Sequence, residues 1–290
     1  MPDRPDSAPT RALAWLYAAG EQRAALGALC ALEREIGASL RPGLDHQVAH
    51  TRLAWWREEC ARCVQGQPAH PLTRELGGLF APAGLAPLAG LAGLVDTAIW
   101  DLAAAAFENR HELTGYCQRW SAAMVEPPAL LARHAAMRDG AAQTVPAAAI
   151  AIAQARAVGV SLRELELLLA LAPEARAGRL RLPLDELARA RVSHESLAQP
   201  TWPHSLAALL RERHRELRAA LAAGVRALAP TLRVRLRGLV VWSAIACGQS
   251  VRAERRLPQA RPRRDVHVLS DNWRAWRAAR QVDAGRAMVH

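Results

Sequence analysis

The stretch HSLAALLRERHRELRAALAAGVRAL, residues 204–228, decides the fold class of this chain. Its apolar residues recur with the period of an α-helix and form a single stripe, which contains Leu206, Leu210, Leu217, Leu221 and Val225. Arginine and glutamate occupy the opposite side of the same helical projection. The pattern predicts a long amphipathic helix with one buried face.

The composition of the whole chain favours helices as well. Alanine, leucine and arginine dominate the 290 residues, and all three are strong helix formers. β-Branched residues are sparse, and no long run of valine, isoleucine and threonine favours a sheet. Hydrophobic residues make up 51% of the chain, which predicts a folded protein with a large core. We therefore expect an all-α protein.

Helical periodicity continues on both sides of this stretch, interrupted by glycine and proline. The further helices are expected at residues 10–40 (divided near Gly20), 45–66, 71–80, 91–107, 112–124, 129–137, 147–158, 162–171, 183–190 and 231–255. We expect a disordered lead over residues 1–9, one helical domain over 10–255 and a basic tail over 256–290. A short final helix in the tail places Trp273 and Trp276 on one face.

The chain is strongly basic, with a formal net charge of +11, and all 38 basic residues are arginine. This balance favours ligands that carry phosphate, anionic membrane surfaces or nucleic acid. No motif that reads a nucleic-acid groove is present, so no specific nucleic-acid partner is expected. The arginine-rich tail predicts docking on an anionic membrane surface or a protein partner, a segment that covers the helical domain, or solvated charge.

The cysteines and the apolar runs indicate the compartment. Five cysteines at irregular spacing favour a reducing compartment over a disulfide framework. Cys60 and Cys63 form a lone C-x-x-C pair in a helical pattern, where ordinary packing is favoured over a metal site. The N-terminus lacks the apolar core of a secretory signal, and the apolar run 238–248 is too short to span a membrane. We expect a cytoplasmic protein that is soluble or peripheral at the membrane.

Three segments, in order along the chain, carry a resemblance to a known family. They are RLAWWREE at 52–59 with PAHPLTR at 68–74, LTGYCQR at 113–119, and GRLRLPLDEL at 178–187. These segments are similar to the helix that follows the first aspartate-rich motif, the Tyr-Cys helix and the Gly-Arg-hydrophobic-Tyr-Leu-Pro segment of the squalene/phytoene synthase family. The resemblance implies a single large helical bundle of the isoprenoid-synthase type, built around a central cavity.

Enzymes of that family join two prenyl diphosphates with the help of Mg²⁺. Two aspartate motifs face each other across the cavity, and the metal bridges their carboxylates to the diphosphate and stabilises the leaving pyrophosphate. The resemblance places the first motif on residues 34–41 of this chain. Arg34 is kept there, but the two metal-binding positions are Gly37 and Arg41.

The second motif falls on residues 166–174, where Leu169 and Ala170 replace its arginine and first aspartate. Only Glu174 remains as an acid at its final position. We therefore predict no catalytic residue and no metal site, and we expect no cofactor unless an active enzyme uses Mg²⁺ with rearranged ligands.

The residues that we consider for substrate binding are Arg34, Arg41 and Arg52 for a diphosphate, and Trp55 and Tyr116 for the cavity. Ion-paired or solvated arginines and packed aromatic side chains are the alternatives. Asp45 is expected to cap a surface helix that carries His46 and His50, in preference to forming a metal site with them.

Three functions follow from these observations. The first is an inactive or strongly diverged family member that binds an isoprenoid or another lipid, or acts as an assembly partner. A mitochondrial complex I assembly factor of the same family also has degraded motifs. The second is an active head-to-head prenyltransferase with rearranged metal ligands. The third is an interaction protein whose basic tail docks on a membrane or an acidic partner.

Overall fold

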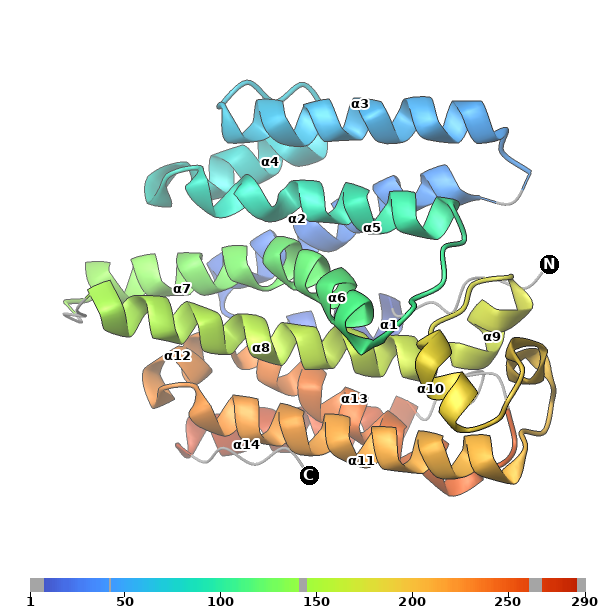
Figure 1. Ribbon diagram of the computed structural model, residues 1–290. Helices are drawn as coiled ribbons and strands as arrows, with labels where there is room; N and C mark the ends of the chain where they lie inside the picture. Colours follow the sequence, from blue (N-terminus) through green and yellow to red (C-terminus); the bar gives the residue numbers. More distant parts are fainter. Residues whose placement is uncertain (1–7, 42, 141–144, 261–267, 286–290) are drawn as a thin grey trace.

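The computed structural model describes residues 8–41, 43–140, 145–260 and 268–285, which form an all-α fold as the sequence predicts (Figure 1). The helices are α1 (Ala8–Leu16), α2 (Gly20–Gly37), η1 (Ala38–Leu40), α3 (His46–Val64), α4 (Pro71–Phe80), η2 (Ala81–Ala83), η3 (Ala86–Leu91), α5 (Ala92–Leu102), α6 (Arg110–Met124), α7 (Glu126–Arg138), α8 (Val145–Leu169), α9 (Leu171–Arg176), α10 (Leu184–Arg189), η4 (His194–Ala198), α11 (His204–Ala227), α12 (Pro230–Arg235), α13 (Arg237–Arg256) and α14 (Val268–Asp283). Within the described ranges the one β-type pairing is an isolated bridge between Thr201 and Gln259.

Helix α8 runs through the middle of the molecule and organises the other helices (Figure 1). Helix α6 packs on one side of it, and α11 and α13 pack on the other. Helices α3, α4 and α5 form one end of the bundle, while α14 lies at the opposite end against α13. The centre of the bundle is therefore the place where α1, α2, α6, α8 and α13 approach one another.

Two expected helix boundaries differ from those in the structure. The segments 147–158 and 162–171 were expected as separate helices, but α8 continues through Gly159 to Leu169. A Cβ at Gly159 would lie 2.2 Å from Ser121 Oγ, so this glycine allows α6 and α8 to pack closely and does not end a helix. The expected helix 231–255 is divided into α12 and α13 at Leu236.

The expected break between the helices 112–124 and 129–137 is present, but it lies at Val125, before Pro127 and Pro128. Both prolines lie in the first turn of α7. The first backbone N–H groups of a helix have no partner within the helix, so proline removes no hydrogen bond there. The expected cap on α3 is confirmed, because Asp45 Oδ1 accepts hydrogen bonds from the backbone N–H groups of Gln47 and Val48.

The cysteines are buried and unpaired. Burial raises the pKa of the Cys60 thiol to about 12 and that of the Cys63 thiol to about 11, so both remain protonated and pack as small apolar groups. Within the described residues, no cluster of three or more potential ligands could hold a metal ion. None of the described helices is long and apolar enough to cross a membrane.

Candidate functional site

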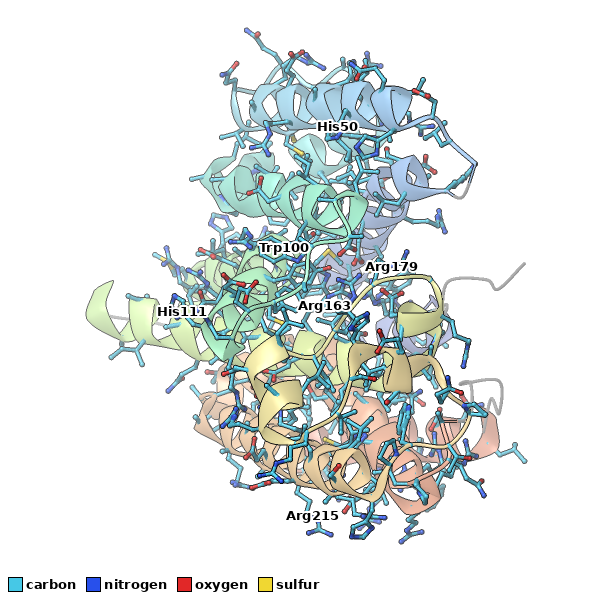
Figure 2. All side chains as sticks on the ribbon, turned by 45° about the vertical axis from the view of Figure 1, so that its right-hand side comes forward. His50, Trp100, His111, Arg163, Arg179 and Arg215 are labelled. Atoms are coloured by element: carbon cyan, nitrogen blue, oxygen red, sulfur yellow. The ribbon has the colours of Figure 1, made fainter. Side chains whose placement is uncertain are left out.

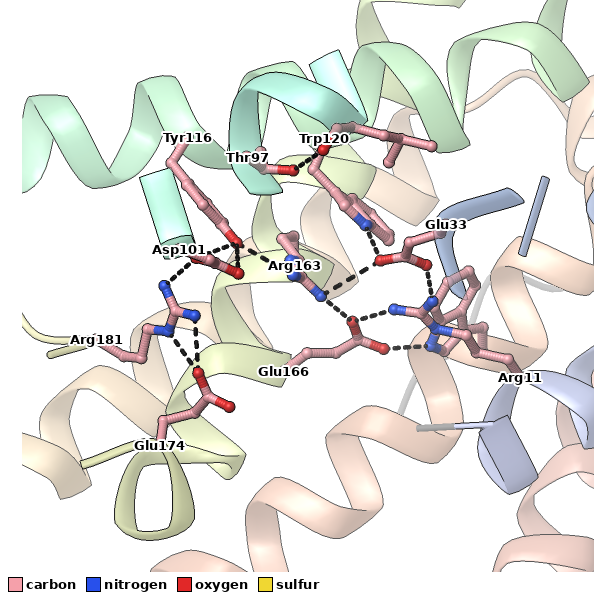
Figure 3. Close-up of polar contacts among 12 residues, drawn as sticks. Arg11, Glu33, Thr97, Asp101, Tyr116, Trp120, Arg163, Glu166, Glu174 and Arg181 are labelled. Atoms are coloured by element: carbon pink, nitrogen blue, oxygen red, sulfur yellow. Dashed lines mark hydrogen bonds and ion pairs between the residues drawn. The ribbon is translucent and has the colours of Figure 1, made fainter. Parts of the chain in front are cut away.

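The centre of the bundle contains charged side chains that belong to helices far apart in the sequence (Figure 3). Arg11 of α1 lies between two carboxylates, Glu33 of α2 and Glu166 of α8, and forms an ion pair with each. The distance from Arg11 Nη2 to Glu166 Oε2 is 2.9 Å. Arg163 also faces both acids, with its Nη1 at 3.3 Å from Glu166 and 3.9 Å from Glu33. Two carboxylates and two guanidinium groups therefore share one interior site.

Two indole rings enclose this site. Trp120 Nε1 donates a hydrogen bond of 2.8 Å to Glu33, and Trp242 Nε1 donates one of 3.1 Å to Glu166. The Arg11 guanidinium lies over both rings, 4.8 Å from the centroid of Trp242 and 5.5 Å from that of Trp120. These contacts satisfy the carboxylates and stabilise the arginine by cation–π attraction in a setting with little solvent.

A second group of charges adjoins the first. Arg181 lies between Asp101 of α5 and Glu174 of α9, with 2.7 Å between the paired atoms on each side. Arg179 also pairs with Glu174 at 2.7 Å. Tyr116 connects the two groups, because its hydroxyl donates to Asp101 at 3.2 Å and accepts from Arg163 Nη2 at 3.3 Å. Figure 2 labels Arg163 and Arg179 among all the side chains of the described structure.

We call these eight charged residues the central network: Arg11, Glu33, Asp101, Arg163, Glu166, Glu174, Arg179 and Arg181. Four are arginines and four are acids, so their formal charges cancel. Burial alone would raise the pKa of Glu33, but Arg11, Arg163 and the Trp120 indole hold it below its ordinary value. The same acids raise the pKa of Arg11 against the effect of burial. Glu33 and Arg11 are thus both charged at neutral pH.

The site does not fit the magnesium centre that the resemblance implies. Gly37 and Ala170 carry no ligand atom, and Arg41 would repel a cation. Glu174 is buried, but Arg179 and Arg181 neutralise it. The carboxylates that do converge from α2 and α8 are already neutralised by guanidinium groups, so a divalent cation would have to displace them.

Most of the residues proposed from the sequence lie outside the central network. Arg34, Arg41 and Arg52 are exposed, and their binding of a diphosphate stays a prediction. Trp55 is 40% exposed on α3 and contacts Arg62 instead of lining an interior cavity. Tyr116 is fully buried and joins the network as described above.

The sequence reasoning missed Arg11, Glu33, Arg163 and Arg181. One signal was available for α8, where Arg163 and Glu166 stand three residues apart and therefore share one face of a mostly apolar helix. Glu33 faces the centre while the neighbouring candidate Arg34 is exposed, because a shift of one residue along a helix turns the side chain by about 100°.

An apolar pocket lies beside the network, behind Trp242. The space inside it that the centre of a water-sized sphere can occupy is about 20 Å³, and the total empty space, which includes open solvent, is about 340 Å³. The lining side chains are mainly apolar and include Leu26, Met124, Leu239 and Trp242. Gln22 also lines it, and its buried Oε1 has no hydrogen-bond partner among the described residues. The pocket therefore combines an apolar wall with one free acceptor.

Comparisons with known proteins agree with the fold. A family model described as squalene/phytoene synthase matches residues 5–272. A dehydrosqualene synthase crystallised in complex with a ligand is similar with a TM-score of 0.72 and 15% identity, over 96% of this chain and 91% of that chain. The squalene synthase HpnC from Alicyclobacillus acidocaldarius is similar with a TM-score of 0.62 and 15% identity, over 84% of this chain and 87% of that chain. A search of curated proteins found no match. Since the family model covers most of the sequence, this chain belongs to the squalene/phytoene synthase family.

Proposed function

We propose that this protein is a family member that does not condense prenyl diphosphates and acts instead as a lipid-binding or assembly protein. The observation that supports this proposal is the position of Arg11 between Glu33 and Glu166. Glu33 directly precedes the segment 34–41 to which the resemblance assigns the first metal motif, and Glu166 is the first residue of the segment 166–174 assigned to the second. An arginine thus supplies, from within the chain, the positive charge that a metal ion would bring to facing carboxylates.

The energetics favour a closed centre. Arg11 is 6% exposed and Glu166 is also 6% exposed, so both charges are removed from water and depend on each other. Removing one partner of a buried ion pair typically costs about 3–5 kcal/mol, because the other charge remains buried without compensation. A metal ion that displaced Arg11 would impose a cost of this kind, in addition to the loss of its own hydration shell.

The apolar pocket behind Trp242 supports an apolar ligand. Pockets that hold small molecules are lined mainly by apolar side chains and contain a few polar groups that orient the ligand. Leu26, Met124 and Leu239 provide the apolar wall, and Gln22 Oε1 provides an acceptor for a ligand hydroxyl group. We propose the end of an isoprenoid or other lipid chain as the occupant.

The test of inactivity is incubation of the purified protein with farnesyl or geranylgeranyl diphosphate and Mg²⁺. We expect no pyrophosphate release above that of heat-inactivated protein. Metal-dependent release together with a C30 or C40 product would refute the proposal. The variant Glu33→Gln is the matched control, because a genuine activity of this centre would decrease when one of its two facing carboxylates is removed.

An active enzyme with rearranged ligands remains the second candidate. The observation in its favour is that Glu33 and Glu166 face each other across the centre. This candidate requires Arg11 to leave the site when substrate and metal bind. It therefore predicts that Arg11→Met raises the affinity for Mn²⁺, whereas the principal proposal predicts loss of stability without ordered metal binding.

A further inference from the structure

Helix α14 presents a large apolar stripe to solvent at the end of the bundle opposite α3 (Figure 1). Leu269 is 86% exposed, Trp273 59% and Trp276 45%. These residues stand at i, i+4 and i+7, so they share one face of the helix. The two indole rings stack with centroids 4.8 Å apart and an interplanar angle of 28°, which makes them one aromatic surface.

The orientation of α14 is fixed by its other face. Ala275, Ala278, Ala279 and Val282 are buried in the core and pack toward α13. Ion pairs hold both ends of the helix, from Arg252 to Asp271 at 2.6 Å and from Arg237 to Asp283 at 2.9 Å. The tryptophan stripe therefore points outward because the structure holds it there.

The charges around the stripe are unbalanced. Asp271, Asp283 and the nearby Glu254 are all engaged in ion pairs with arginines of the bundle. Arg277 and Arg280 are exposed on α14 and form no ion pair with any described residue. The Arg280 guanidinium lies 5.8 Å from the centroid of the Trp276 ring. The outward face of α14 is consequently aromatic and cationic, and the acids of this helix, Asp271 and Asp283, are paired with arginines of α13.

We propose that α14 docks the protein on an anionic membrane surface. Tryptophan is favoured at the boundary between water and lipid, where its ring is apolar and its N–H remains hydrated. Arginine side chains beside it can lie along the apolar stripe and place their charge among the lipid phosphates. The helix would lie flat, since its inner face is occupied by α13, and only the stripe would enter the interface.

A second copy of this chain fits the surface less well. Pairing two α14 helices face to face would bring Arg277 and Arg280 toward identical charges, while the acids of this helix are already engaged. An anionic surface, by contrast, complements both arginines at once and also accepts the two indole rings. The charge pattern thus selects a phosphate-bearing bilayer over self-association.

The experiment is co-sedimentation of the full chain with vesicles of phosphatidylcholine, alone or mixed with phosphatidylglycerol. We expect binding to the mixed vesicles that weakens as salt is added. Trp273→Ala/Trp276→Ala should reduce the binding constant by at least about tenfold. Removing charge in Arg277→Ala/Arg280→Ala should reduce it by about fivefold per arginine, the equivalent of about 1 kcal/mol each.

Matched controls lie at the other end of the molecule. Trp55→Ala removes a tryptophan that is 40% exposed, and Arg41→Ala/Arg52→Ala removes two exposed arginines, so neither variant should change vesicle binding. Circular dichroism checks that each variant is folded. If Trp273→Ala/Trp276→Ala does not fold, the comparison of Arg277→Ala/Arg280→Ala with its arginine control tests the proposal. Equal binding to both vesicle types, no binding to either, or equal losses in α14 and control variants would each overturn the proposal.

Discussion

The central network and helix α14 use the same two kinds of side chain in opposite ways. In the centre, Arg11 lies over Trp120 and Trp242 and is paired with two acids. On α14, Arg280 lies over Trp276 at a similar distance, but no described acid pairs with it. The difference is therefore not in the arginine–indole contact itself. It lies in burial and in the carboxylates, which make the centre neutral and closed and leave α14 cationic and open.

The comparison explains why the same contact has different consequences. A buried guanidinium must be paired, since an unpaired charge in a protein interior is costly. An exposed guanidinium remains hydrated and can exchange water for an anionic ligand at little cost. In the interior of this bundle, arginine is therefore paired with carboxylates and inaccessible. On the surface of α14, it remains available to an anionic ligand.

The largest effect is expected from breaking the centre. Arg11→Met leaves Glu33 and Glu166 with only Arg163 between them and should lower the free energy of unfolding by about 3–5 kcal/mol. Chemical denaturation monitored by circular dichroism measures the change. Combining it with Glu33→Gln should recover part of the loss, because one uncompensated charge is removed while the acceptor for Trp120 remains.

The matched control for that prediction is Arg41→Met. Arg41 is exposed, so its replacement should change the free energy of unfolding by no more than about 0.5 kcal/mol. A loss below about 1 kcal/mol for Arg11→Met would contradict the view that the central network depends on this arginine.

The next effect concerns a buried group that is kept neutral. His214 is 3% exposed, and burial together with Arg218 lowers its pKa to about 4, against a smaller opposing effect of Glu254. The unfolded chain binds the proton near pH 6.5, so stability is complete above that pH and is lost as pH falls toward 4. The loss reaches on the order of 3 kcal/mol only once the folded histidine is protonated as well, below about pH 4.

Thermal unfolding between pH 7 and about pH 4.5 tests this expectation, because this range begins above the ordinary pKa of histidine and ends well below it. His214→Gln should flatten the dependence of the melting temperature on pH, whereas His111→Gln, at an exposed position, should leave it unchanged. Equal slopes for wild type and His214→Gln would show that this histidine does not titrate as expected.

Two close helix contacts should also tolerate a larger side chain differently: the contact of α8 with α6 at Gly159 in the centre, and the contact of α13 with α14 at Gly248. A Cβ at Gly159 would meet Ser121 Oγ at 2.2 Å and Val125 Cγ2 at 2.7 Å, so Gly159→Ala should destabilise the protein by about 1–3 kcal/mol. The three atoms nearest to a Cβ at Gly248 all belong to the long, flexible side chain of Arg274, at 2.4–2.8 Å. Gly248→Ala should therefore cost less, and a larger loss than for Gly159→Ala would reverse the comparison.

The smallest effect is expected where an arginine–carboxylate pair is exposed. Arg57 and Asp96 are 2.6 Å apart, but their side chains are 50% and 36% exposed. Solvent screens such a pair, so Arg57→Ala should change the free energy of unfolding by less than about 1 kcal/mol. A double-mutant cycle with Asp96→Ala isolates the pair energy, and a value near that of the central network would show that burial is not decisive.

The sequence predicted the fold more completely than the site. The expected bounds of α4 and α11 match the structure within a residue, because proline and the apolar stripe mark them locally. The site depends on contacts between distant segments, since Arg11 meets Glu166 across 155 positions in the chain. With the motif acids absent, nothing in the local sequence indicated that Glu33, and not Arg34, faces the centre.

The most direct test of the closed centre is the binding of Mn²⁺ measured by electron paramagnetic resonance, with farnesyl diphosphate present. If arginines take the place of the metal, wild type and the variant Glu33→Gln/Glu166→Gln should bind Mn²⁺ equally weakly, with no site of fixed stoichiometry. A stoichiometric site in the wild type that disappears in this variant would contradict the account.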